Sequence, residues 1–111
     1  MEEISASRLL SVDVHREPVA SDGLSEALST ASRTLLESEV EVGLWEAGPG
    51  TDTDVEVDEV FLVLSGAGSV TFDDASAIDL RPGVLIRLRA GDRTRWEITE
   101  RMRKLYRDQG H

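Results

Sequence analysis

The most constraining feature of this chain is an apolar segment placed between a carboxylate and a glycine. Residues 59–66 read Glu-Val-Phe-Leu-Val-Leu-Ser-Gly. An apolar run of this length, bounded by a turn residue, is typical of a strand that is covered on both faces. A second strand is expected at residues 84–88, between Gly83 and Gly91. The chain is therefore expected to fold around two strands whose ends are marked by glycine turns.

The rest of the sequence repeats this pattern of short strands and turns. Residues 51–58 alternate strictly between acidic and other side chains, which is the period of a half-buried strand. Strands are predicted at residues 33–36, 40–46, 51–58, 60–64, 66–72, 77–80, 84–88, 93–99 and 102–106. Turn signals between strands at a spacing of about 8–12 residues predict an all-β fold, an antiparallel sandwich or barrel.

The first 32 residues do not share this pattern. Residues 4–14 are expected to form an edge strand or an extended arm, with apolar side chains at Ile4, Leu9, Leu10, Val12 and Val14. Ser21, Asp22 and Gly23 offer a cap for a short helix of one or two turns. Its apolar face would consist of Leu24, Ala27, Leu28 and Ala31. The length of 111 residues fits one domain, divided into an arm and short helix at 1–32 and a barrel at 33–111.

Composition and charge exclude several classes of protein. The chain has no cysteine, which excludes disulfides and thiolate metal sites, and no apolar run of about 18 residues. Its acidic start does not resemble a signal peptide, so a cytoplasmic protein is expected. Residues 81–111 hold nine basic and four acidic side chains, which raises the possibility of nucleic-acid binding. The net charge of −10 argues against nucleic acid, and no membrane partner is expected.

Two glycine motifs carry a family resemblance. Glu59 and Gly66 resemble the second half of the first cupin motif, and residues 83–94 resemble the second motif. Further matching groups are Gly43-Leu44-Trp45-Glu46, Pro49-Gly50, Asp58-Glu59, Arg95-Trp96-Glu97 and Arg103-Lys104-Leu105-Tyr106. Over residues 33–107 the chain resembles small single-domain cupins related to the metal-binding half of (S)-ureidoglycine aminohydrolase and to the ethanolamine-utilisation cupin. The resemblance implies a double-stranded β-helix, or jelly-roll barrel, with a short N-terminal extension.

The same resemblance implies a metal site, and the sequence departs from it. The ligand positions of cupins correspond here to Thr53, Val55, Glu59 and Thr94. Valine cannot ligate a metal and threonine is a poor ligand, while His15 and His111 lie far from the motifs. A metal-free or weakly metal-binding protein without a cofactor is therefore expected. In an alternative register, shifted by one residue, Asp52 and Asp54 would join Glu59 at the ligand positions.

The jelly-roll pairing implied by the resemblance places residues 52–57 beside residues 93–99. Apolar patterning then predicts that Thr53, Val55 and Val57 face inward with Thr94, Trp96 and Ile98. Asp54 and Glu56 would face outward, opposite Arg93 and Arg95. This arrangement would explain the acidic strand and the basic tail without a ligand.

The candidate site consists of the inward-facing aromatic and polar side chains. Trp45, Phe61 and Trp96 either fill the barrel or line a pocket, and both alternatives stay open. Glu59 is a buried carboxylate that needs a partner, and Lys104 is expected to supply it. This pair is either structural or catalytic. His15 is expected on the surface.

The preferred hypothesis is a cupin that holds a small polar metabolite in its barrel, with Trp45, Thr53, Phe61, Thr94 and Trp96 as ligand-binding residues. As an enzyme on a ureide-like or small carboxylate or amine substrate, it would use Glu59 and Tyr106 for proton transfer and Lys104 as an electrostatic stabiliser. The alternative is a non-catalytic interaction or assembly subunit with a filled barrel. A homodimer is expected, in which the apolar arm covers a neighbouring barrel.

Overall fold

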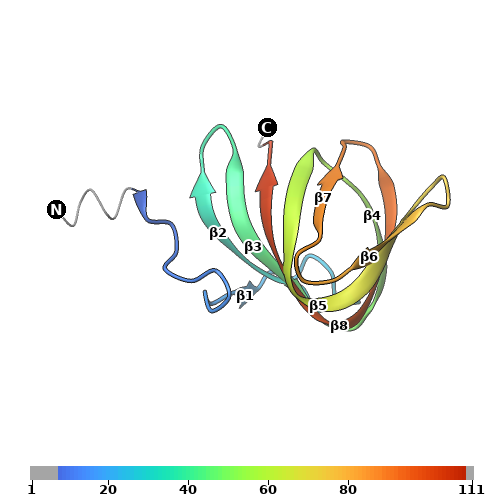
Figure 1. The fold of residues 1–111 in the computed structure, drawn as a ribbon, viewed down its shortest axis with the longest axis horizontal. Helices are drawn as coiled ribbons and strands as arrows, with labels where there is room; N and C mark the ends of the chain where they lie inside the picture. Colours follow the sequence, from blue (N-terminus) through green and yellow to red (C-terminus); the bar gives the residue numbers. More distant parts are fainter. Residues whose placement is uncertain (1–7, 110–111) are drawn as a thin grey trace.

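The computed structural model describes residues 8–109 and shows a curled antiparallel sheet (Figure 1). Within these residues the strands are β1 (Ala20–Ser21), β2 (Ala31–Glu37), β3 (Glu41–Ala47), β4 (Gly50–Val55), β5 (Glu59–Phe72), β6 (Ala77–Leu80), β7 (Leu85–Leu88) and β8 (Arg93–Asp108). The sheet follows the order β1-β2-β3-β8-β5-β6, while β4 pairs with β8 and β7 pairs with β5. The predicted all-β fold is confirmed. Ile4 and His111 lie outside the described residues.

The two long strands β5 and β8 form the spine of the barrel. The C-terminal half of β8 pairs with β3 and β5, and its N-terminal half pairs with β4 and β5. Between these halves the register of β5 shifts near Gly66, whose φ is +92°. A Cβ atom at Gly66 would collide with the backbone of Arg101 and Met102. Glycine therefore permits the close crossing at which both strands pass from one half of the barrel to the other.

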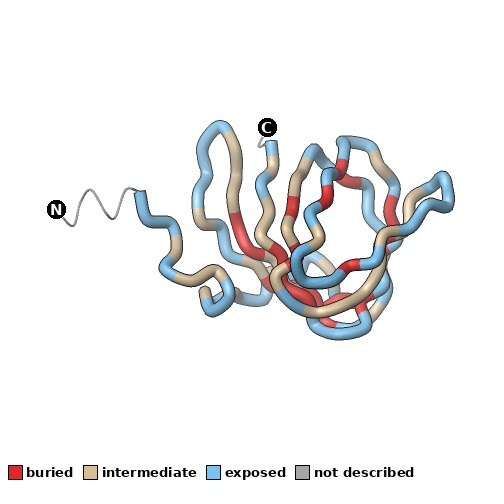
Figure 2. The backbone as a smooth tube through the Cα atoms, viewed as in Figure 1, coloured by how far each residue is buried: buried red, intermediate tan, exposed pale blue. Residues whose placement is uncertain are grey.

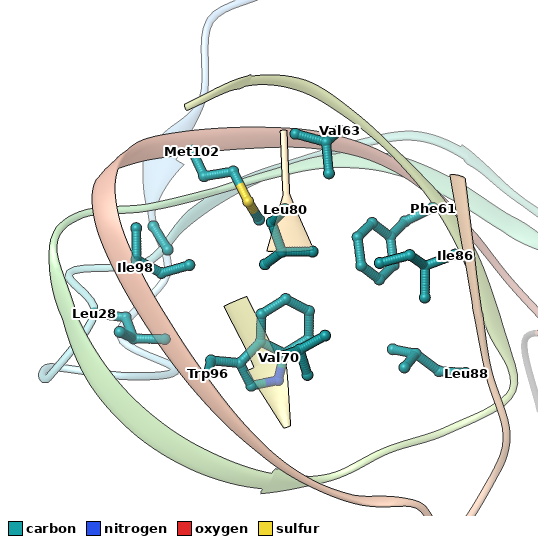
Figure 3. Close-up of a cluster of buried hydrophobic side chains, with 11 residues drawn as sticks. Leu28, Phe61, Val63, Val70, Leu80, Ile86, Leu88, Trp96, Ile98 and Met102 are labelled. Atoms are coloured by element: carbon teal, nitrogen blue, oxygen red, sulfur yellow. The ribbon is translucent and has the colours of Figure 1, made fainter. Parts of the chain in front are cut away.

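The core occupies the part of the barrel around this crossing (Figure 2). Figure 3 shows its side chains converging from β5, β6, β7 and β8. The cluster consists of Leu28, Ala47, Phe61, Val63, Val70, Leu80, Ile86, Leu88, Trp96, Ile98 and Met102. Burial of each large apolar side chain stabilises the fold by about 1.5–3 kcal/mol. The side chains at the opposite end of the barrel, described below, are largely polar.

The predicted short helix is absent, and a single turn stands in its place. Ser25 Oγ accepts a hydrogen bond from the Leu28 amide at 3.1 Å, as a helix cap would. The turn ends at Ser29, whose φ of +49° leaves the helical region. Leu28 nevertheless packs in the core, whereas Leu24 is 77% exposed. The loop of residues 22–30 is therefore anchored by Leu28 across the end of the barrel.

The predicted facing of residues 51–58 is wrong by one position. Asp52 lies opposite Trp96 and Asp54 opposite Thr94, so these two carboxylates share the inner face. Thr53 faces outward, and Val55 and Val57 are 59% and 53% exposed. A one-residue slip moves every side chain of a strand to the other face. Both aspartates face inward, as in the alternative register, but the pairing alone does not bring them to Glu59.

The register also changes the predicted charge pairs. Arg93 and Arg95 face outward as expected, but they lie opposite Val55 and Thr53 and not opposite carboxylates. Arg93 Nε lies 4.0 Å from a carboxylate oxygen of Asp73 in the β5–β6 hairpin. The acidic side chains of β4 are therefore not neutralised by the basic tail.

The arm crosses the outer face of the barrel and forms no strand between residues 9 and 19. Arg103 Nη1 donates a hydrogen bond to the Val14 carbonyl at 2.7 Å, and Arg33 pairs with Glu17 at 2.9 Å. The arm carries exposed apolar side chains at Leu9, Leu10 and Val12. His15 is 65% exposed, as predicted. No helix among residues 8–109 is long and apolar enough to cross a membrane.

Candidate functional site

The site is built on three neighbouring strands whose side chains face the interior in matched rows. Because β8 lies between β3 and β5, each inward side chain of β8 has one neighbour on either strand. From the outer end inward, the rows are Glu41–Asp108–Glu59, Gly43–Tyr106–Phe61 and Trp45–Lys104–Val63. The carboxylates therefore lie at the end of the barrel, with aromatic and cationic groups beneath them.

Lys104 is a buried cation at the floor of the site. Its Nζ donates to Glu59 Oε2 at 2.6 Å, and the two side chains are only 7% and 9% exposed. The ammonium also lies 4.6, 4.3 and 5.0 Å from the ring centroids of Trp45, Phe61 and Trp96. Ring faces attract a desolvated cation, so the rings and Glu59 together stabilise the ammonium group of Lys104. The predicted partnership of Glu59 and Lys104 is present in the structure.

Asp108 adds a second carboxyl group beside Glu59. Burial, followed by a hydrogen bond with Glu59 and the charge of that residue, raises the pKa of Asp108 to about 7. Glu41 also raises the Asp108 pKa, while Lys104 opposes the shift. Among the described residues, the buried Asp108 Oδ1 has no donor partner. The raised pKa leaves Asp108 partly protonated near neutral pH, beside the carboxylate of Glu59.

Tyr106 is oriented by a glycine on the neighbouring strand. Its hydroxyl donates to Glu41 Oε2 at 2.8 Å. A Cβ atom at Gly43 would lie 2.5 Å from that hydroxyl, so only glycine leaves room for the ring to cross β3. Burial, and next the hydrogen bond to Glu41, raise the pKa of Tyr106 well above its ordinary value. Tyr106 is therefore a neutral donor that holds Glu41 at the edge of the site.

A third buried carboxylate, Glu56, lies between β4 and the Gly91–Asp92 turn. Its side chain is fixed by Thr94 Oγ1 at 2.6 Å and by Trp96 Nε1 at 3.0 Å, both of which donate to Glu56 Oε2. Desolvation raises the pKa of Glu56, and the two hydrogen bonds oppose this effect. Glu56 thus orients the indole of Trp96 from the side of β4.

These groups surround a cavity of about 420 Å³, within the range of small-molecule sites. Its lining combines the turn of residues 22–30, the inner face of β4 and the three-strand rows. Ser25 Oγ donates to Asp52 Oδ2 at 2.6 Å and so connects the turn to β4. This bond and the Thr53 amide hold the pKa of Asp52 below its usual range. The lining residues that carry the argument below are Trp45, Trp96, Lys104, Tyr106, Glu41, Asp52, Asp54, Glu56, Glu59 and Asp108.

The structure brings most of the predicted site residues together. Glu59, Lys104, Tyr106, Trp45 and Trp96 all line the cavity. Phe61 lies beneath Lys104 in the core, and its ring centroid is 5.7 Å from that of Trp96. The aromatic residues were expected either to fill the barrel or to line a pocket, and both occur: Phe61 fills the barrel while Trp45 lines the cavity.

The two threonines predicted to bind the ligand, Thr53 and Thr94, do not point into the cavity. Thr94 is buried and bonded to Glu56, so it lies behind the cavity wall. Thr53 contacts the edge of the cavity but points outward, which corrects its predicted inward position.

The residues present do not fit the metal site that the resemblance implies. Within residues 8–109, no three histidine or carboxylate side chains converge as metal ligands would. Val55, at one ligand position, faces solvent, and Asp52 is bonded to Ser25. Asp52 and Asp54 line the cavity in the shifted register, yet they do not gather around Glu59 as a ligand set.

Sequence reasoning missed Glu41 and Asp108, and it predicted Glu56 on the outer face, where the structure has it buried. The inward Trp45 carried a usable signal for Glu41, because residues of equal parity on one strand share a face. Continuing the alternation of Lys104 and Tyr106 by one more step would have included Asp108. For Glu56 the signal was its shared parity with Asp52 and Asp54, although that face was predicted to be the outer one. Glu56 follows the end of β4, where its backbone bonds with Gly91 and Asp92.

A small antiparallel barrel with glycine crossings and a site between β3, β8 and β5 defines the cupin class of protein. The model of the EutQ-like cupin domain matches residues 36–106, and the chain belongs to that family. A search of curated protein sequences finds no significant match.

Solved structures show the same fold at low sequence identity. The EutQ protein of Clostridium difficile aligns with a TM-score of 0.74 at 18% identity, covering 88% of this chain and 84% of that one. The polyketide cyclase RemF of Streptomyces resistomycificus aligns with a TM-score of 0.71 at 17% identity, covering 88% and 77%. Ectoine synthase of P. lautus aligns with a TM-score of 0.67 at 17% identity, covering 78% of this chain and 67% of that one. Because these neighbours differ in function, their similarity concerns the fold alone.

Proposed function

We propose that this protein binds a small polar metabolite in the cavity between β3, β4 and β8, without a tightly bound metal. The cavity itself carries this proposal. It measures about 420 Å³, within the range of small-molecule sites, and combines two tryptophans with many fixed polar groups, a lining that suits a polar ligand. An open cavity also favours binding over the alternative of an assembly subunit with a filled barrel.

The polar groups are held in place before any ligand arrives. Lys104 is fixed by Glu59 and three rings, Glu41 by Tyr106, and Asp52 by Ser25. A site whose side chains are already oriented loses less conformational entropy on binding. The tilted pair of Trp45 and Trp96, with ring centroids 5.6 Å apart, supplies an apolar wall of fixed shape.

A thermal-shift screen tests this proposal with panels of amines, amino acids, carboxylic acids, ureides and sugars. A ligand at a hundredfold excess over its Kd stabilises the folded state by about 2.7 kcal/mol, which such a screen detects. A hit should quench or shift the fluorescence of Trp45 and Trp96, the two tryptophans of the chain. Glu59→Gln should remain folded and bind the hit more weakly. A hit whose affinity is unaffected by Glu59→Gln would place the binding site elsewhere.

Proton-transfer catalysis is a second candidate, favoured by the pair of Glu59 and Asp108. A carboxyl group that titrates near neutral pH can both donate and accept a proton. Glu59 and Lys104 keep the roles predicted from the sequence, as proton carrier and electrostatic stabiliser. Tyr106 fits a positioning role better than proton transfer, because its pKa is raised and its proton is donated to Glu41. A bell-shaped pH–rate profile that loses one limb in Asp108→Asn would support this candidate.

A further inference from the structure

The charge of the cavity wall is strongly one-sided. Its described lining holds six carboxylates and one ammonium, which leaves a formal excess of five negative charges. With Asp108 and Glu56 both protonated, the excess is still three. A concave site lined by one sign of charge concentrates field lines and attracts the opposite charge. The net charge of the wall therefore disfavours an anionic ligand.

The cation of the wall is already neutralised. Lys104 Nζ lies 2.6 Å from Glu59 and is covered by the rings of Trp45, Phe61 and Trp96, with 7% of its side chain exposed. An incoming carboxylate or phosphate would have to displace Glu59 from this contact and leave a buried charge without its partner, which is costly. The lysine thus does not provide a receptor for an anionic group.

The carboxylates, in contrast, retain free acceptor capacity. Glu41, Asp108 and Glu59 form one row across three strands, so their oxygens face the same end of the cavity. Glu41 accepts bonds from Tyr106 and Thr34 through one oxygen, Oε2. Asp108 lines the same cavity, and its Oδ1, shielded from solvent in the free protein, has no donor among the described residues. An ammonium or amidinium group carries several donors and matches such a row.

We infer that the cavity takes a small organic cation, whose amine or amidine group lies against the row of Glu41, Asp108 and Glu59 and whose carbon chain lies against Trp45 and Trp96. This inference rests on the proposed function and adds the chemical class of the ligand.

Three probes of equal chain length and different charge test the inference by isothermal titration calorimetry at pH 8. They are 1,5-diaminopentane, 5-aminopentanoate and glutarate. We expect the diamine to bind at least about 10-fold more tightly than glutarate and more tightly than the zwitterion, because charge-assisted hydrogen bonds dominate the difference. Glu41→Gln and Asp108→Asn should each weaken diamine binding about 10-fold. Asp73→Asn, on the exposed β5–β6 hairpin, is the charge-matched control and should leave the affinity unchanged.

The possible outcomes separate this inference from the proposed function. Tighter binding of glutarate or of the zwitterion would overturn the cationic class while leaving a metabolite site in place. Equal diamine affinity in the wild type, Glu41→Gln and Asp108→Asn would show attraction to the acidic surface alone and would also overturn it. Failure of all three probes, together with failure of the wider thermal-shift panels, would overturn both proposals.

Discussion

The ion pair of Lys104 and Glu59 allows a quantitative test of how the site is stabilised. Its side chains are 7% and 9% exposed, and Nζ and Oε2 are 2.6 Å apart. Lys104→Met removes the ammonium and leaves Glu59 buried without its partner, which should cost about 3–5 kcal/mol of the free energy of unfolding. Glu59→Gln should cost less, because the three rings still stabilise the lysine by up to about 2 kcal/mol.

The double variant Lys104→Met with Glu59→Gln removes both charges at once. A buried ion pair replaced by neutral groups of similar volume is often close to neutral in stability, so we expect the double variant within about 1 kcal/mol of the wild type. The coupling energy from the double-mutant cycle should then reach about 3 kcal/mol.

Urea denaturation at pH 7 measures the free energy of unfolding of the wild type, the two single variants and the double variant. The exposed pair of Arg81 and Asp79, with 73% and 74% exposed side chains, is the control cycle and should couple by less than about 1 kcal/mol. A coupling energy for Lys104 and Glu59 as small as that of the control would refute the reasoning, because it would mean that water screens the pair.

Three further predictions concern pH, metal and assembly. Since the folded-state pKa of Asp108 is raised from 3.8 to about 7, the native protein retains a proton that the unfolded chain loses, and this group's contribution to stability falls as pH rises from about 4 to 7. Asp108→Asn should reduce that fall in urea titrations at pH 5 and 8, and an unchanged pH dependence would contradict the assignment. Elemental analysis of the purified protein should find no stoichiometric manganese, iron, nickel or zinc, and about one equivalent would contradict the reading of the ligand positions. Light scattering should give twice the chain mass of 12.2 kDa, as expected for a homodimer. Deletion of residues 1–14, which carry the exposed Leu9, Leu10 and Val12, should shift the protein toward monomer or aggregate. A soluble full-length monomer would show that the arm packs on the barrel of its own chain.

Local sequence patterns determined most of the strands. Apolar segments and turn residues predicted β6, β7 and both halves of β5, because short-range periodicity and turn chemistry act within a few residues. The predicted division of β5 at Gly66 was wrong, since the structure has one continuous strand there. The same logic failed at residues 24–31, where alanine and leucine spacing favoured a helix. Tertiary contact overrode it: Leu28 inserts into the core and the turn closes at Ser29 after four residues.

The acidic segment of residues 51–58 shows why the site was harder to predict than the fold. Strict alternation established that one face would carry Asp52, Asp54 and Glu56 and the other Thr53, Val55 and Val57. It could not establish which face was inner, and the usual preference for buried valine gave the wrong answer. The interior at this end of the barrel is a polar cavity, so the carboxylates enter it while Val55 and Val57 lie in solvent.

The class of fold, the burial of Glu59 and its pairing with Lys104 could be predicted from the sequence, since motif position and strand parity are properties of the chain. Only the tertiary structure decided that Glu41, Asp108 and Glu59 form one row, because these residues are up to 67 positions apart and meet through the pairing of β3, β8 and β5. The raised pKa of Asp108 follows from that meeting. Its causes are burial and a neighbouring charge, and neither exists until the three strands are assembled.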